Sequence, residues 1–108
     1  MKWIYLIIAI ITEVIATSAL KESQGFSKII PSIVVITGYS LTFYFMSLTL
    51  KEMSVGITYA IWSGMGILLI SLIGYFRYNQ VLDSAAILGM SFIAVGIIIL
   101  RFFSNVTT

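Results

Sequence analysis

The chain has 108 residues, of which 60% are hydrophobic and only 9% are charged, and its mean hydropathy is +1.12. A soluble domain of this length could not bury so much apolar surface, because small domains have a large surface for their volume, so lipid is the expected solvent. The net charge of +2 is too small and dispersed to indicate a nucleic-acid partner, and the absence of cysteine and histidine excludes disulfides, thiolate metal sites and histidine proton carriers.

Four apolar runs follow one another along the chain, at residues 3–20, 29–50, 57–76 and 85–103. Each is close to the ~20 residues that a helix needs to cross ~30 Å of hydrocarbon. Apolar side chains occur at all helical phases, as expected of helices surrounded by lipid. The breaks KESQGFSK, KEMSVG and RYNQVLDS hold most of the charges and are too short for a soluble domain. We therefore expect an all-α integral membrane protein with a single four-helix transmembrane domain over residues 1–108.

The first run also has some features of a signal peptide, because it begins after Lys2 and ends in the small residues ATSA. A carboxylate, Glu13, interrupts its apolar stretch, however, and three more spans follow in place of a soluble mature protein. We therefore expect this run to remain in the protein as its first transmembrane helix.

Glu13 lies ten residues after Trp3, which is ~15 Å along a helix and close to the middle of the bilayer. A charge there costs at least ~2.5 kcal/mol, so the side chain must face a cavity or a partner. The basic residues all lie at or near the ends of the runs, where they can reach the interface, so none is a counter-ion at the depth of Glu13. Burial then favours the protonated acid and a bound cation favours the carboxylate. Competition of this kind is the minimal chemistry of an antiporter.

A structural interpretation of Glu13 remains open, in which a neutral acid is hydrogen-bonded to a neighbouring helix and only holds the bundle together. The helical face of Glu13 favours a ligand site, since it includes the small residues Ala9, Ala16 and Thr17 at offsets of three and four. Side chains of this size leave room for a ligand or for a closely packed helix.

The second and third runs carry aromatic residues that suit an organic cation better than a metal ion. Tyr59 and Trp62 share a helical face in ITYAIWSGMG, and Tyr39, Phe43 and Met46 share one in the second run. The π faces of Trp and Tyr rings attract organic cations. A Na⁺ or Ca²⁺ site would need several oxygen ligands, which one Glu and scattered hydroxyls do not supply. We expect a binding site for hydrophobic cations and protons, with no metal and no cofactor.

Glycines in the last two runs predict a hinge and a packing seam. Gly64 and Gly66 permit a bend in the third run. Gly89 and Gly96 lie seven residues apart on one face of the fourth run, where they allow close approach of a second helix. Because four helices can barely enclose a cavity, we expect a homodimer that pairs along this seam.

The basic residues are divided evenly between the two sides of the predicted bundle. Three lie on the side of the N-terminus, second loop and C-terminus, and three lie in the first and third loops: Lys2, Lys51 and Arg101, and Lys21, Lys28 and Arg77. The positive-inside rule then gives no preferred orientation, so we expect dual topology and an antiparallel dimer with inverted repeats. The alternative, that the N-terminal amine or unequal weighting of the loops selects one orientation, remains open.

The chain resembles the small multidrug resistance family in YLIIAIITEVIATSALK around Glu13, in GITYAIWSGMGILLISLIG, in Leu82–Asp83 and in the glycine-spaced fourth run. The resemblance covers essentially the whole chain. It implies an antiparallel homodimer in a bacterial inner membrane that exchanges protons for toxic cations by alternating access, and not an enzyme. It further implies that Glu13 is the shared proton and substrate site, that Tyr59 and Trp62 form an aromatic wall and gate, and that Tyr39 and Thr42 lie nearby.

Within that family the chain looks more like the exporters of quaternary ammonium compounds than the guanidinium exporters, which have Trp where this chain has Ala16. Three positions depart from the family pattern: Ser54 replaces a common Pro, Val81 replaces a common basic residue, and Arg101 adds a charge as in the guanidinium exporters. The guanidinium type therefore remains an alternative. So do a proton-carrying proteolipid subunit, which needs only a helical hairpin and no aromatic cage, and a subunit that does not transport.

Overall fold

The computed structural model describes residues 2–105, which form four helices: α1 (Lys2–Glu22), α2 (Ile29–Thr49), α3 (Val55–Arg77) and α4 (Ser84–Phe103). All four are long and apolar enough to cross a membrane, and these residues contain no strand. The prediction of an all-α membrane protein with four spans is therefore confirmed. The helices begin and end within two residues of the four apolar runs. Residues 1 and 106–108, which belong to the predicted domain, lie outside the described part of the chain.

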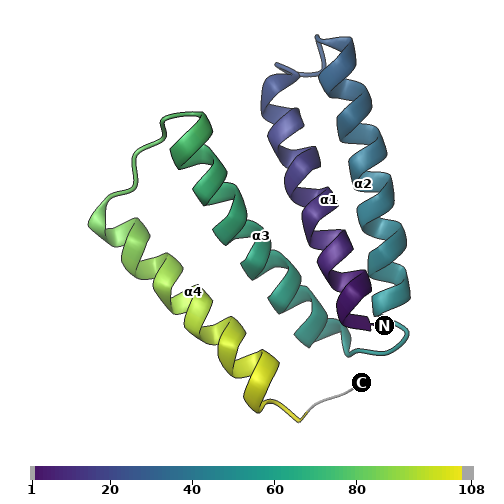
Figure 1. The fold of residues 1–108 in the computed structure, drawn as a ribbon, viewed down its shortest axis with the longest axis vertical. Coiled ribbons are helices and arrows are strands. Elements are labelled where there is room, and N and C mark those ends of the chain that lie inside the picture. The colour runs from purple at the N-terminus through teal and green to yellow at the C-terminus, as the bar shows by residue number, and fades with distance from the viewer. Residues whose placement is uncertain (1, 106–108) are drawn as a thin grey trace.

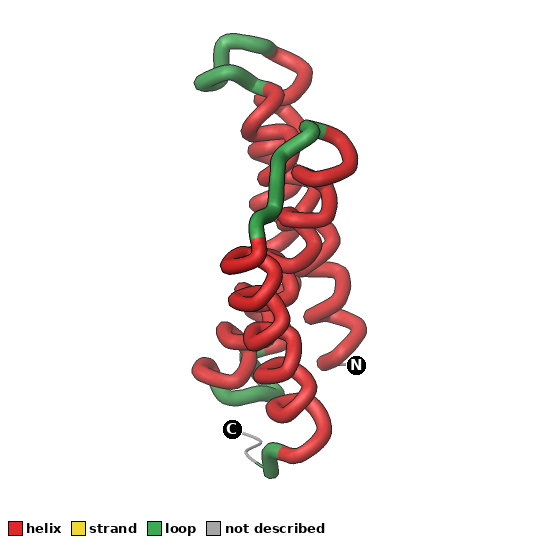
Figure 2. The backbone as a smooth tube through the Cα atoms, turned by 90° about the vertical axis from the view of Figure 1, so that its left-hand side faces the viewer, coloured by secondary structure: helices red, strands yellow, loops and turns green. Residues whose placement is uncertain are grey.

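The helices form a thin layer of 44 × 35 × 17 Å, in which α1 packs mainly on α2, and α3 packs on α1 and on α4. Figure 1 shows the hairpin of α1 and α2, with α3 beside α1 and α4 at the far edge, and Figure 2 shows the layer edge-on. The first and third connections lie at one end of the layer, and the second connection lies at the other end with the start of α1 and the end of α4. Each end therefore carries three of the six basic residues.

The core lies where α1 meets α2 and α3. Its buried members are Leu6, Ala9, Ile10, Val14, Met46, Met53 and Ile61. In contrast, α4 has no buried residue, although it is the most apolar of the four helices. Apolar side chains need no protein partner in lipid, so the exposed surface of α4 is compatible with a membrane and not with water.

A close approach of backbones holds α1 against α2. A Cβ atom placed on Gly38 would lie 2.7 Å from the Cβ of Ala16 and 3.2 Å from the carbonyl oxygen of Thr12. Only glycine fits at this position without moving one of the helices. Helices in lipid commonly pack through such small residues, because dispersion contacts and hydrogen bonds replace the hydrophobic effect as the driving force.

The connection between α1 and α2 shows how α1 ends and how α2 begins. It is a turn in which Gln24, Gly25 and Phe26 have φ of 49°, 72° and 65°, in the left-handed region. The fully buried Ser23 supports this turn, since its hydroxyl donates to the Leu20 carbonyl at 2.7 Å and accepts from the Phe26 N–H at 3.1 Å. Pro31 is tolerated in the first turn of α2 because the N–H that it lacks has no partner within the helix.

Side-chain caps start the last two helices. Ser54 accepts from the Ile57 N–H at 3.4 Å at the start of α3, and Asp83 accepts from the Ala86 N–H at 2.8 Å at the start of α4. Residues of these types at the N-cap satisfy one of the free N–H groups of the first turn. The departure at Ser54 from the family pattern therefore has a local function, which is to cap α3.

Candidate functional site

A pocket of about 270 Å³ lies between α1 and α3 and contains Glu13. Six of its eight lining residues come from one face of α3, at helical spacing. The complete lining is Glu13, Thr17, Tyr59, Trp62, Ser63, Gly66, Ile67 and Ile70. The structure thus brings together four residues that the sequence predicts for the site, namely Glu13, Thr17, Tyr59 and Trp62.

The two carboxylate oxygens of Glu13 have different surroundings. Oε1 accepts a hydrogen bond from the Thr17 hydroxyl at 2.8 Å, and the same hydroxyl lies 2.6 Å from the Tyr39 hydroxyl. Because the single hydrogen of Thr17 is used toward Glu13, Tyr39 is the donor in the second bond. Oε2 is buried and has no hydrogen-bond partner among residues 2–105. Tyr39, which is not in the pocket lining, is therefore linked to Glu13 through Thr17.

Oε2 of Glu13 lies close to the backbone of α3. A Cβ atom placed on Gly66 would be 3.0 Å from this oxygen, so glycine at position 66 leaves room for the carboxylate. No basic side chain among residues 2–105 pairs with Glu13, since the ion pair described there joins Arg77 to Glu22. Nor do three carboxylates in that range come together to hold a metal ion. The pocket therefore contains an uncompensated acid in an apolar setting.

Two aromatic rings form a wall of the pocket. The centroids of Tyr59 and Trp62 are 5.3 Å apart and the rings are nearly perpendicular, at 83°, which is a favourable edge-to-face arrangement. Trp62 is partly buried, and its Nε1 is enclosed without a hydrogen-bond partner, whereas Tyr59 is 60% exposed. The carboxylate and these rings together offer a negative charge and π faces to an organic cation.

Three other predicted site residues are buried outside the pocket lining, two of them, Ala16 and Thr42, in the contact between α1 and α2. Ala9 and Ala16 are fully buried, and Ala16 packs against Gly38. Thr42 is also fully buried, and its hydroxyl lies 2.8 Å from the Thr12 hydroxyl and donates to the Gly38 carbonyl at 2.9 Å. In the single chain these residues hold the helix that carries Glu13, and their contribution to a binding site stays a prediction.

The predicted hinge and seam glycines fall into two groups. α3 continues as a helix through Gly64 and Gly66, and a Cβ atom on Gly64 would lie 2.8 Å from Ile97 of α4. A Cβ atom placed on Gly89 or on Gly96 would meet no neighbouring atom within 4 Å, so their face of α4 is open. Whether α3 bends and whether α4 pairs with a second copy stay predictions.

Three lining residues, Ser63, Ile67 and Ile70, are absent from the predicted set. Helical spacing would have found them, because they lie four, eight and eleven positions after Tyr59 and so share its face. Thr12 is also absent from that set, although its hydroxyl forms one of the hydrogen bonds between α1 and α2. A lone threonine in an apolar run gives no signal that distinguishes a bridging hydroxyl from one bonded to its own helix.

Several known proteins are similar to this chain in sequence. Residues 1–93 match the family described as Small Multidrug Resistance protein. The quaternary ammonium compound-resistance protein QacE of Escherichia coli is 50% identical over 103 residues, which cover 95% of this chain and 94% of that protein. A multidrug transporter of Pseudomonas aeruginosa is 46% identical, with coverage of 96% and 94%.

A third relative, the quaternary ammonium compound-resistance protein QacC of Staphylococcus aureus, is 41% identical over 105 residues, which cover 97% of this chain and 98% of that protein. The matches therefore extend over nearly the full length of both partners. Together with four helices that can span a membrane, they show that the chain belongs to the small multidrug resistance family and is a multi-pass protein of the bacterial inner membrane.

Proposed function

We propose that this protein exports hydrophobic organic cations, such as quaternary ammonium compounds and cationic dyes, in exchange for protons. The observation that carries the proposal is the buried, unpaired Oε2 of Glu13 in a pocket walled by Tyr59 and Trp62. The names of the relatives, which refer to quaternary ammonium resistance and multidrug transport, support the same substrate class.

Exchange follows from the charge of the pocket. A buried carboxylate without a counter-ion is costly, and either a proton or a cation removes that cost. A proton that binds Glu13 removes the negative charge that attracts the cation, and a bound cation stabilises the ionised form. The two ligands therefore displace one another, and the flow of protons down their gradient drives the cation outward by alternating access.

The lining of the pocket favours large, weakly hydrated cations. Trp62 and Tyr59 offer π faces, and Ile67 and Ile70 offer apolar surface, while Glu13 supplies the only carboxylate of the lining. A quaternary ammonium ion forms no hydrogen bonds and loses little when it leaves water for such a site. We infer that shape and charge, more than hydrogen bonding, select the substrate.

The pocket of a single chain is too open to enclose such a substrate. Its volume of about 270 Å³ is below the ~300–1,000 Å³ of typical small-molecule sites, and Tyr59 remains 60% exposed. A second copy would supply the missing wall. The open face of α4 at Gly89 and Gly96 is a suitable seam for pairing, and an antiparallel arrangement would give two equivalent states open to opposite sides.

The test is transport by purified protein in lipid vesicles with an imposed pH gradient. We expect uptake of radiolabelled tetraphenylphosphonium that depends on the gradient and is abolished by Glu13→Gln, which keeps the size of the side chain but cannot bind and release a proton. Glu52→Gln, which removes an exposed carboxylate from the second connection, is the matched control and should transport normally. Gradient-driven uptake by Glu13→Gln would refute the proposed role of Glu13.

A further inference from the structure

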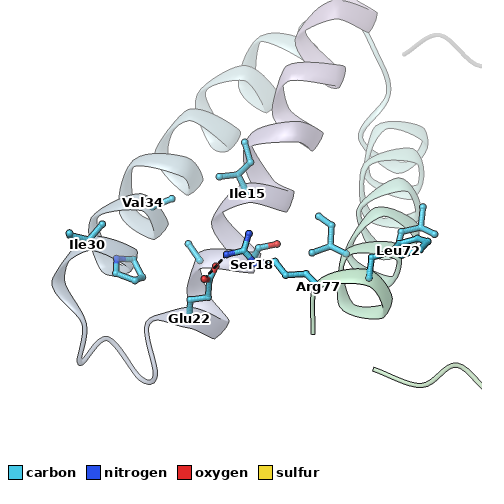
Figure 3. Close-up of a pocket in the computed structure, with 11 residues that line it drawn as sticks. Ile15, Ser18, Glu22, Ile30, Val34, Leu72 and Arg77 are labelled. Atoms are coloured by element: carbon cyan, nitrogen blue, oxygen red, sulfur yellow. Dashed lines mark hydrogen bonds and ion pairs between the residues drawn. The ribbon is translucent and has the colours of Figure 1, made fainter. Parts of the chain in front are cut away.

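A second and larger cavity, a groove of about 730 Å³, lies over α1 between α2 and α3 (Figure 3). Its floor on α1 includes Ile15, Ser18 and Glu22, which lie two, five and nine positions after Glu13. At ~100° per residue these positions are ~140–200° away from Glu13 around the helix. The groove is therefore separate from the Glu13 pocket. Its walls are Ile30, Pro31 and Val34 of α2 and Leu72, Ile73, Phe76 and Arg77 of α3.

One end of the groove carries a charged rim, formed by Glu22 and Arg77 where α1 and α3 end. The Arg77 guanidinium donates to Oε1 of Glu22 at 2.8 Å, and the Tyr78 hydroxyl donates to Oε2 at 3.2 Å. The pKa of Tyr78 is raised, first by burial and then by the Glu22 carboxylate, so the phenol keeps its proton and remains a donor.

The rim has hydrogen-bonding capacity left for a ligand. The side chains of Arg77 and Glu22 are still 61% and 40% exposed. Arg77 has five N–H donors, and each oxygen of Glu22 can accept more than one bond. The groove therefore presents one positive and one negative group, side by side and accessible, at its membrane surface.

From the rim inward, the groove changes from charged to polar to apolar, and a phospholipid changes in the same way from its headgroup to its esters to its acyl chains. Glu22 and Arg77 lie at the surface, and Ser18 lies ~6 Å deeper along α1. The Ser18 hydroxyl oxygen is buried and has no hydrogen-bond partner, so it offers an unused donor below the charges. Beyond it the lining is apolar, beginning with Ile15 on α1 and Leu72 on α3. Charges, a hydroxyl and apolar walls thus match a headgroup, an ester and an acyl chain.

We propose that this groove binds one molecule of phosphatidylethanolamine. Its ammonium group donates to Glu22, its phosphate accepts from Arg77, an ester carbonyl accepts from Ser18, and an acyl chain lies between the walls. The volume of the groove falls within the ~300–1,000 Å³ of small-molecule sites. Phosphatidylcholine has no N–H group for Glu22, and phosphatidylglycerol has no positive charge, so both fit the paired rim less well.

The test places a fluorescent reporter in the groove. Phe76 lines it and is 76% exposed, so Phe76→Trp adds a tryptophan there, and the emission of the unmodified protein is subtracted as background. Quenching is compared in vesicles that contain phosphatidylethanolamine or phosphatidylcholine with brominated acyl chains. We expect phosphatidylethanolamine to be preferred at position 76 by about three- to fivefold, as for one exposed charged contact. Ile87→Trp, at an exposed position on α4 that lies ~160–180° around the helix from Gly89 and Gly96, should show no preference.

Variants at the rim identify the source of the preference. In the Phe76→Trp background, Glu22→Gln should reduce the preference for phosphatidylethanolamine to a ratio of about one, whereas Glu52→Gln should leave this ratio unchanged. Ser18→Ala should weaken the binding of both lipids equally and keep the ratio between them, because both lipids contain the ester. If Glu22→Gln does not fold, the preference for phosphatidylethanolamine over phosphatidylcholine in the Phe76→Trp protein still tests the proposal.

Three results would overturn the proposal: equal quenching by the two lipids at position 76, stronger quenching there by brominated phosphatidylglycerol, or no quenching at position 76 while position 87 is quenched. The last would show that protein, such as a second copy, covers the groove. None of these results depends on transport, so the lipid site and the proposed function are tested separately.

Discussion

At the residue scale, the hydrogen bonds around Glu13 divide the tasks between its two oxygens. Oε1 is held by Thr17, which is held in turn by Tyr39 of α2, so the carboxylate is fixed in position by two helices. Oε2 is buried beside Gly66, a lining residue of the pocket, and has no hydrogen-bond partner in the described part of the chain, so we propose that it is the atom that binds a proton or a cation. We propose that Thr17 is a positioning residue, which acts on the substrate through the orientation of Glu13.

This division predicts the effect of removing one hydroxyl. Thr17→Val keeps the shape of the side chain but loses the donor to Glu13, and hydrogen bonds to charged groups are worth ~1.5–3 kcal/mol. We expect cation affinity to fall about tenfold or more, with recovery in Thr17→Ser. Thr12→Val, which removes a hydroxyl of the same helix that bonds to Thr42, should leave affinity within a few-fold of the native value. Equilibrium binding of tetraphenylphosphonium measures all three, and equal losses in the two valine variants would contradict the assignment.

The affinity for cations should depend both on the side chain at position 62 and on the pH. A desolvated cation–π contact is worth ~2 kcal/mol or more, so Trp62→Ala should weaken binding of aromatic and quaternary cations about tenfold or more, and Trp62→Phe should lose less. Trp3→Phe, remote from the pocket, is the control. In all of these proteins affinity should fall as the pH is lowered, because protonation of Glu13 removes its charge. Affinity that does not change with proton concentration at any pH at which the protein stays folded would contradict competition by protons.

At the scale of helices, α1 is the element on which the site depends. It packs on α2 through Gly38 and the hydroxyls of Thr12 and Thr42, and on α3 through the Glu13 pocket. A substitution that pushes α1 and α2 apart, as overpacking at Gly38 would, therefore moves Glu13 relative to Tyr59 and Trp62, although it touches neither ring. Thr12→Val keeps the size of the side chain and so keeps the spacing of the two helices.

The contact at Gly38 predicts a specific loss of stability. Gly38→Ala would place a methyl group 2.7 Å from the Cβ of Ala16, and overpacking of this kind typically costs ~1–3 kcal/mol. The companion change Ala16→Gly should restore part of the loss. Gly96→Ala, where the new methyl group meets nothing within 4 Å, should leave the fold of the single chain intact and weaken only pairing. Unfolding in increasing SDS, followed by helical circular dichroism, compares the three. A Gly38→Ala protein as stable as the native one would show that the helices can move apart freely.

Some features of the fold and the site can be predicted from the sequence, and others cannot. The four spans follow from length and apolarity alone, because a bilayer requires ~20 apolar residues and internal hydrogen bonds. Glu13, Tyr59 and Trp62 stand out because charge and aromatic rings are unusual at mid-membrane. The burial of Ala16 and Thr42 between α1 and α2 could not be predicted, since apolar residues occupy all phases of these helices and no periodicity marks the packed face. Gly66 is similar, because its spacing indicates a bend and its contact with Glu13 appears only in three dimensions.

At the scale of the whole molecule, the single chain looks like one half of an assembly. It is only 17 Å thick in its shortest dimension, which is less than two helix diameters, and its outermost helix, α4, has no buried residue. A layer of this thickness cannot surround a substrate on all sides. Two layers facing each other through their Glu13 pockets would enclose one, with the lipid groove of each copy on the outer surface.

The orientation of those two layers is predicted by the distribution of charge. Lys2, Lys51 and Arg101 share one end of the layer, and the other three basic residues share the opposite end, so neither end has the excess that normally fixes topology. Arg101 is also placed 4.3 Å from the centroid of the Trp3 ring, which keeps its charge at the end where α1 begins. We expect the chain to insert in both orientations and to pair antiparallel.

A reporter fused to the C-terminus tests this expectation in whole cells, since alkaline phosphatase is active only outside the inner membrane and green fluorescent protein is fluorescent only inside. The native chain should give both signals. Replacing Glu52 and Ser54 by Lys should bias insertion strongly, because two added charges break a balance of three against three, and should reduce resistance to cationic dyes. Coexpression with a copy that carries two extra Lys in the first connection, and is therefore biased the other way, should restore resistance, whereas either copy alone should not. A C-terminus found on one side only in the native chain, or full resistance from one biased copy, would rule out the antiparallel dimer.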